Sequence, residues 1–126
     1  MSKSKSLVLG DVSFEILAGA FEVHNIFGAG FLEKVYEHAL IIEMTKRGLV
    51  AESQKEINVS YKGSIVGSYF ADLLINDEVI VELKAVEALT KVHEAQLLNY
   101  LKTTGKKLGL LINFGKDRVE HKRLVL

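Results

Sequence analysis

The chain has 126 residues, a formal net charge of zero and no cysteine. This length predicts one domain with its own hydrophobic core, and we expect residues 1–10 to form a flexible tail. Because the net charge is zero, the chain as a whole is not attracted to nucleic acid or to anionic membranes. Any such contact must therefore come from a local basic patch. The lack of cysteine excludes disulfides and thiolate metal sites. Neither a signal-peptide core nor a membrane-length apolar run follows the first residues, so we expect a cytoplasmic protein.

The first part of the chain predicts two helices. The first is indicated by apolar residues at helical spacing, namely Ile16, Ala20, Val23 and Phe27. Asp11 is its expected N-cap, and residues 28–30 interrupt it. The second helix is expected over residues 31–47, with Gly48 as the left-handed residue that ends it.

The middle of the chain predicts three strands joined by tight turns. Apolar and polar residues alternate over residues 57–61, and further strands are expected at 65–75 and 78–85. Residues 62–64 and 76–77 have the composition of hairpin turns. The first three strands should therefore be neighbours in one sheet.

The last part predicts a helix over residues 90–104, which ends at Gly105, and strands at 108–114 and 118–126. A helical connection after three hairpin-linked strands implies a mixed central sheet flanked by helices, in the α/β (α+β) class.

Three ionisable residues interrupt apolar strands. Residues 69–75 and 79–85 are apolar on both strand faces except at Asp72, Glu82 and Lys84, which predicts strands covered on both sides. A buried carboxylate costs several kcal/mol unless it is paired or bound to a metal. These residues therefore need a chemical reason.

Spacing supplies one such reason. Glu82 and Lys84 project from the same face of their strand, and the turn before that strand brings Asp72 close to Glu82. Two adjacent carboxylates repel, and a divalent cation removes the conflict; oxygen ligands suit Mg²⁺ or Mn²⁺. Lys84 would then orient a water or stabilise phosphoryl charge. The alternative is a buried ion-pair network without metal.

Asp72, nine further residues and then Glu82-Leu83-Lys84 resemble the signature of the PD-(D/E)XK nuclease superfamily, with Ala71 in the place of its proline. Residues 30–36, GFLEKVY, match the GxxExxY motif of one family in that superfamily, and the resemblance continues through HEAQLLNY and GLLINFG. It implies a restriction-endonuclease-like αβββαβ core and metal-dependent cleavage of phosphodiester bonds in DNA or RNA.

The resemblance also implies a set of metal ligands. These are Asp72, Glu82, the backbone carbonyl of Leu83 and, directly or through water, Glu33 from the second helix. The alternative for Glu33 is a solvated residue favoured by the helix dipole. Tyr36, on the same helix face, is expected to be a packing residue with its hydroxyl at the rim.

His93, Gln96 and Tyr100 form one stripe along the third helix. The similar Q-x-x-x-Y pattern of RecB-like nucleases implies contacts to substrate phosphate or to the catalytic lysine. The alternatives are an ordinary half-exposed helix face and, for His93, a capping or surface histidine.

The leading hypothesis is thus a Mg²⁺- or Mn²⁺-dependent nuclease acting on nucleic acid. Basic residues near 102–107 and 116–123 either follow a phosphate backbone or form a solvated surface. Because the net charge is neutral, tight substrate binding would need a homo-oligomer or a protein partner. The alternatives are a non-cleaving module that binds nucleic acid or protein, and a protein whose charged cluster is structural.

Overall fold

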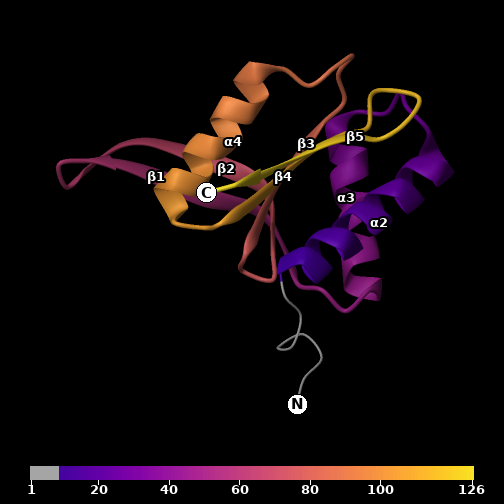
Figure 1. Ribbon diagram of the computed structural model, residues 1–126, viewed down its shortest axis with the longest axis horizontal. Helices are drawn as coiled ribbons and strands as arrows, with labels where there is room; N and C mark the ends of the chain where they lie inside the picture. Colours follow the sequence, from indigo (N-terminus) through magenta and orange to yellow (C-terminus); the bar gives the residue numbers. More distant parts are fainter. Residues whose placement is uncertain (1–8) are drawn as a thin grey trace.

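A computed structural model describes residues 9–126 of the chain (Figure 1). Its elements in chain order are α2 (Leu9–Phe27), α3 (Glu33–Lys46), β1 (Ala51–Tyr61), β2 (Ser64–Ile75), β3 (Val79–Lys84), α4 (Lys91–Thr104), β4 (Leu108–Asn113) and β5 (Glu120–Val125). Of the flexible tail expected over residues 1–10, residues 9 and 10 begin α2, and the remainder lies outside the described residues.

The strands form one five-stranded sheet in the order β1-β2-β3-β4-β5. Neighbours are antiparallel except β3 and β4, which are parallel and connected by α4. This confirms the predicted mixed sheet flanked by helices and the αβββαβ order. The hairpin turn at Asn76 and Asp77 is also confirmed, since both residues have positive φ angles (52° and 58°), which such turns require.

Three boundaries differ from the prediction. α2 starts at Leu9, so Asp11 lies in its first turn and is not the cap. α3 starts at Glu33 because the preceding glycine-rich segment continues through Leu32, which has an extended backbone. β1 starts at Ala51, well before the alternation at Ile57, because backbone pairing to β2 extends into a polar stretch without periodicity.

Helices cover both faces of the sheet, α2 and α3 on one and α4 on the other (Figure 1). The side of α2 and α3 has the larger core, with buried side chains such as Ile16, Leu40, Leu83, Ile112 and Phe114. The α4 side is smaller and includes Ile57, Ala71, Leu74, Ile80, Leu97, Leu101 and Leu111. Burial of these apolar groups is the main contribution that holds the helices on the sheet.

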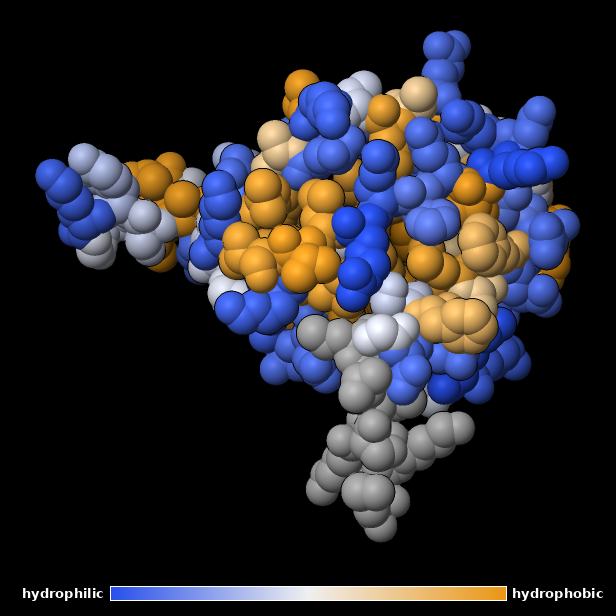
Figure 2. Space-filling view, viewed as in Figure 1, coloured by the Kyte–Doolittle hydropathy of each residue, from blue (hydrophilic) through white to orange (hydrophobic). Residues whose placement is uncertain are grey.

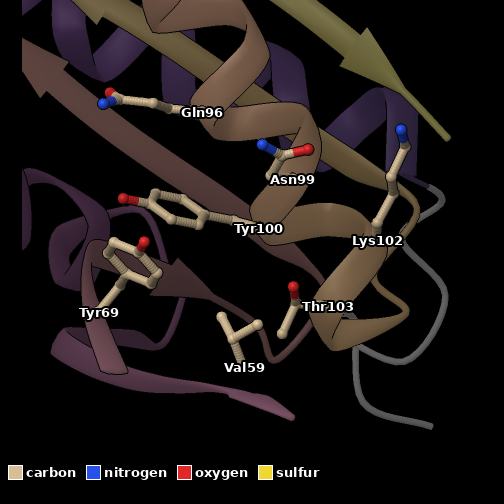
Figure 3. A pocket seen from close by; sticks show the side chains of 7 residues that line it. All are labelled: Val59, Tyr69, Gln96, Asn99, Tyr100, Lys102 and Thr103. Carbon is tan, nitrogen blue, oxygen red and sulfur yellow. The ribbon is translucent and has the colours of Figure 1, made fainter. Parts of the chain in front are cut away.

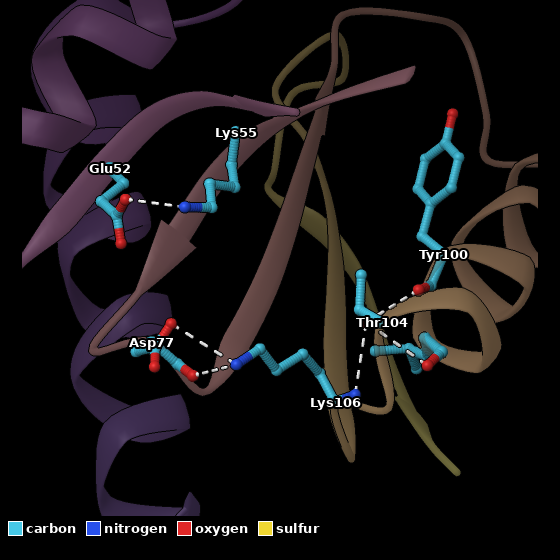
Figure 4. A network of polar contacts seen from close by, with 7 residues as sticks. Glu52, Lys55, Asp77, Tyr100, Thr104 and Lys106 are labelled. Atoms are coloured by element: carbon cyan, nitrogen blue, oxygen red, sulfur yellow. Dashed lines mark hydrogen bonds and ion pairs between the residues drawn. The ribbon is translucent and has the colours of Figure 1, made fainter. Parts of the chain in front are cut away.

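The C-terminal end of α4 is tied to the turn between β2 and β3 (Figure 4). The ammonium of Lys106 donates to the backbone carbonyl of Asp77 at 2.8 Å, and its backbone N–H donates to Thr104 Oγ1 at 3.2 Å. The hydroxyl of Thr104 in turn donates to the carbonyl of Tyr100 at 2.8 Å. These contacts fix the position of α4, and of Tyr100 on it, relative to the central strands.

β1 and β2 extend beyond the sheet as a hairpin arm, residues 55–71 (Figures 1 and 2). β3 pairs with β2 only from Leu73 to Ile75, so the earlier part of β2 has no neighbour except β1. Tyr69 and Phe70 are therefore 49% and 55% exposed. The expectation that residues 69–75 are covered on both sides is wrong for this part of the strand.

Gly115 provides a test of the packing at the end of β3. A Cβ added at this position would overlap the backbone N and O of Val86 and lie 2.7 Å from the carbonyl carbon of Ala85. We expect Gly115→Ala to lower the free energy of unfolding by about 2 kcal/mol, measured by urea denaturation.

Gly67→Ala is the matched control, because its new Cβ would meet only a Tyr69 ring atom, at 4.0 Å. Its stability should change by about 0.5 kcal/mol or less. Equal stability of the two variants would contradict the packing described for Gly115.

Candidate metal and nuclease site

β2 and β3 separate at Asp72, where side chains replace the backbone ladder. The last regular pair before the separation is Leu73 with Val81. Beyond it, the Asp72 backbone N–H donates to Glu82 Oε2 at 2.8 Å, and the Leu83 N–H donates to Asp72 Oδ2 at 2.8 Å. We call this arrangement the fork. The structure thus brings the two predicted acids together across neighbouring strands.

The fork concentrates negative charge away from water. Burial and, after it, the charge of Asp72 raise the pKa of Glu82 to about 7, against a hydrogen bond from the Asp72 backbone that lowers it. Burial also raises the pKa of Asp72, while the hydrogen bond from Leu83 lowers it. The positive charge of Lys84 lowers both pKa values but does not offset burial. Carboxylates perturbed in this way are typical of functional sites.

Lys84 and Glu33 lie at the edge of the fork. Lys84 is half-buried, and none of the ion pairs among residues 9–126 involves Asp72, Glu82 or Lys84. The structural ion-pair network considered from the sequence is therefore not observed. Glu33, in the first turn of α3, is exposed, and its Oε2 accepts from the Ala85 N–H at 3.2 Å. The charge of Glu33 contributes to the raised pKa values of Asp72 and Glu82.

Tyr36 holds the loop that precedes Glu33. Its hydroxyl donates to the Gly28 carbonyl at 2.6 Å and accepts from the Phe31 N–H at 3.2 Å. Its ring stacks on Phe114 of the segment after β4, with centroids 4.5 Å apart. The predicted packing role is confirmed, but the hydroxyl is fully buried and not at the rim.

Glu37 is a site residue that the sequence reasoning missed. Its carboxylate is buried and accepts from Ser53 Oγ at 2.8 Å and from Gln54 Nε2 at 3.0 Å. Gln54 has a φ of 52° and lies opposite Asp72, where the ladder between β1 and β2 is interrupted. Glu37 thus holds the strained strand beside Asp72, and its charge raises the Asp72 pKa. Its spacing of four from Glu33 was the available signal.

The predicted stripe on α4 contains a capping residue, His93, and two residues farther along the helix, Gln96 and Tyr100. His93 Nδ1 accepts from the Thr90 N–H at 3.1 Å, and the His93 N–H donates to Thr90 Oγ1 at 3.3 Å, which closes a capping box. The capping alternative for His93 is therefore what the structure shows. Gln96 is exposed and Tyr100 half-buried. Burial raises the pKa of the Tyr100 hydroxyl, and the charge of Glu82 raises it further.

The donor set at the fork fits a hard divalent cation. It offers the carboxylate oxygens of Asp72 and Glu82 that the two backbone hydrogen bonds leave free, and oxygen-only ligation suits Mg²⁺ or Mn²⁺. The half-buried Asp72 and the buried Glu82 both have raised pKa values, and a cation between them would relieve the repulsion of their ionised forms. Within residues 9–126, no three His, Cys, Asp or Glu side chains are grouped to hold a metal ion. A cation here would therefore complete its shell with backbone and water oxygens.

Comparison with known proteins identifies the family. The sequence pattern of the PD-(D/E)XK nuclease superfamily matches residues 10–124. The chain therefore belongs to the PD-(D/E)XK nuclease superfamily. Members of this superfamily are nucleases that generally depend on divalent metal ions.

Solved structures agree on the fold. The crystal structure of SSO0001 is similar with a TM-score of 0.54 and 20% identity, over 73% of this chain and 48% of that one. An alkaline exonuclease, LHK-Exo from Laribacter hongkongensis, gives a TM-score of 0.53 and 13% identity, over 99% of this chain and 72% of that one. The chain thus spans about half the length of SSO0001. A search of curated proteins gave no match. Among residues 9–126, no helix has the length and apolar character needed to cross a membrane.

The raised pKa of Glu82 predicts a pH-dependent stability. Between the ordinary value of 4.5 and about 7, the folded state keeps a proton that the unfolded chain releases. The free energy of unfolding should therefore fall as the pH rises through this window and level off above it, by roughly 3 kcal/mol for a shift of this size.

Urea denaturation of the metal-free protein at several pH values measures this effect. Glu82→Gln keeps an acceptor for the Asp72 N–H but cannot titrate, so most of the decline should disappear in this variant. If both proteins show the same pH dependence, Glu82 does not hold the proton.

Proposed function

We propose that the protein is a metal-dependent nuclease of the GxxExxY branch that hydrolyses phosphodiester bonds of nucleic acid. The observation that carries this proposal is the fork, where the half-buried Asp72 and the buried Glu82, both with raised pKa values, accept from each other's strands beside a half-buried lysine that has no ion pair with them. Such an arrangement stabilises the fold little on its own, whereas catalysis of phosphoryl transfer uses each of its groups.

In this proposal Asp72, Glu82 and the Leu83 carbonyl hold Mg²⁺ or Mn²⁺, and Glu33 assists directly or through water. The cation, when bound, supplies Lewis-acid stabilisation of phosphoryl charge and a more acidic water. Lys84 orients the attacking water in line with the scissile bond and stabilises the charge that develops on the phosphate.

Other residues have supporting roles. Glu37 acts as a positioning residue, since it anchors Ser53 and Gln54 of β1, and Gln54, with its positive φ, lies opposite Asp72. Gln96 and Tyr100 contact the substrate from α4. A non-cleaving module is not favoured, because the chain retains Asp72, Glu82 and Lys84 with Glu33 beside them.

The proposal predicts cleavage of DNA or RNA that requires Mg²⁺ or Mn²⁺ and stops with a chelator. Asp72→Ala and Lys84→Ala should each lower the cleavage rate about 100-fold or more, because each removes a group that stabilises the transition state. The measurement is a time course on labelled single-stranded and duplex substrates.

Asp11→Ala and Lys46→Ala are matched controls that remove exposed residues of the same types. They should cleave at the rate of the unmodified protein. Equal trace activity in all four variants would mean that the cleavage comes from a contaminant, and the proposed function would be wrong.

Metal binding also has a readout that does not require cleavage. Mg²⁺ or Mn²⁺ should raise the melting temperature, by mass action on the folded state and by removal of the repulsion between Asp72 and Glu82. Asp72→Ala should lose this shift, whereas Asp11→Ala should keep it. A shift of the same size in both variants would assign the cation to another part of the chain.

A further inference from the structure

A groove lies between the hairpin arm and α4 (Figure 3). Its volume is ≈ 350 Å³, and it is lined by Val59, Tyr69, Gln96, Asn99, Tyr100, Lys102 and Thr103. The arm contributes Val59 and Tyr69, and α4 contributes the other residues. No carboxylate lines the groove, and Figure 3 shows the ammonium of Lys102 directed away from the two tyrosines. Its surface near the rings is therefore aromatic and amide in character.

Tyr69 and Tyr100 form an aromatic pair in the groove, in which Tyr69 is exposed and Tyr100 half-buried. Their ring centroids are 5.3 Å apart with an interplanar angle of 47° (Figure 3). Tyr69 is 49% exposed, although it lies on an arm that has little core of its own. Large aromatic surface that is left open to water at a groove indicates a binding role more often than a packing role.

The groove begins about 10 Å from the fork along β2, since a strand rises about 3.3 Å per residue. Tyr69 precedes Asp72 by three residues on the same strand. Tyr100, on the opposite wall, has a pKa raised by burial and then by the charges of Glu82, Tyr69 and Asp72. A polymer whose phosphate reaches the acids at the fork would therefore extend its neighbouring unit into the groove.

The chemistry of the groove suits a base better than a phosphate. Aromatic side chains stack on unpaired bases regardless of sequence, and amides such as those of Gln96 and Asn99 hydrogen-bond to base edges. Phosphates, by contrast, call for cations, which lie at Lys84 and the proposed metal. Bases in a duplex are already stacked and paired, so they cannot enter between the arm and α4.

We infer that this groove binds an unpaired base next to the phosphate at the fork, so that the substrate class is single-stranded nucleic acid. The inference rests on the proposed function, whose substrate it specifies. It gives a role to Tyr69 and to the exposed face of the hairpin arm, which lie outside the set of Asp72, Glu82 and Lys84.

Binding in chelator tests the inference without any cleavage. Fluorescence anisotropy would compare labelled oligothymidylate and oligouridylate of about 12 nucleotides with a blunt DNA hairpin. We expect tighter binding of the single strands than of the hairpin. Tyr69→Ala should raise the Kd for the single strands about 5- to 100-fold, the range for loss of one stacked base. The oligothymidylate and oligouridylate arms distinguish DNA from RNA as the source of the single strand.

Tyr69→Phe keeps the ring and should bind like the unmodified protein. Tyr61→Ala removes an exposed tyrosine at the tip of the arm, outside the groove, and should also leave the Kd unchanged. Circular dichroism of each variant checks that it is folded. Equal or tighter binding of the hairpin, an equal effect of Tyr69→Ala and Tyr61→Ala, or no binding at all would overturn the inference.

Cleavage assays then separate this inference from the proposed function. Cleavage of duplex only, unaffected by Tyr69→Ala, would overturn the single-strand assignment while the nuclease proposal stands. Single-strand binding that depends on Tyr69, without cleavage of any substrate, would support the groove and refute the nuclease proposal.

Discussion

The reciprocal hydrogen bonds between Asp72 and the segment Glu82–Leu83 are the interaction on which the rest of the site depends. A sheet that opens between two strands leaves backbone groups without partners, and such groups are costly when buried. Here each carboxylate accepts from the backbone of the opposite strand at 2.8 Å. The strands can therefore diverge without orphaned N–H groups. The same bonds bring the half-buried Asp72 close to the buried Glu82, where water screens their charges less than on an open surface.

The helices on the two faces of the sheet contribute side chains around the fork from opposite sides. On one face, α3 contributes Glu33 and Glu37, and Tyr36 fixes the start of that helix against Phe114. On the other face, α4 places Tyr100 beside Tyr69 of β2. The crossover through α4 makes β3 and β4 parallel, so the loops after both strands lie at one edge of the sheet. The site thus lies where both cores and the only parallel pair among the described strands meet.

Local sequence patterns predicted most of the elements, because helix spacing, turn residues and apolar alternation report on neighbours in the chain. The proximity of Asp72 and Glu82 also followed, since a tight turn at residues 76–77 determines which residues lie across from each other. The exposure of Tyr69 could not be predicted in this way, because it depends on where the partner strand β3 stops pairing. Glu37 was missed for a similar reason: its partners Ser53 and Gln54 are distant in sequence and lie in a stretch without periodicity.

The hairpin arm also affects how the protein behaves at high concentration. Among residues 9–126, no strand pairs with the outer edge of β1, and the arm exposes Ile65, Val66 and Phe70 (Figure 2). Open edges with apolar side chains are templates for strand addition by other chains. The positive φ of Gln54 and the register shift after Val59 distort this edge and limit such addition. With a net charge of zero, however, no long-range repulsion keeps molecules apart, so colloidal stability depends on those local irregularities and on salt conditions.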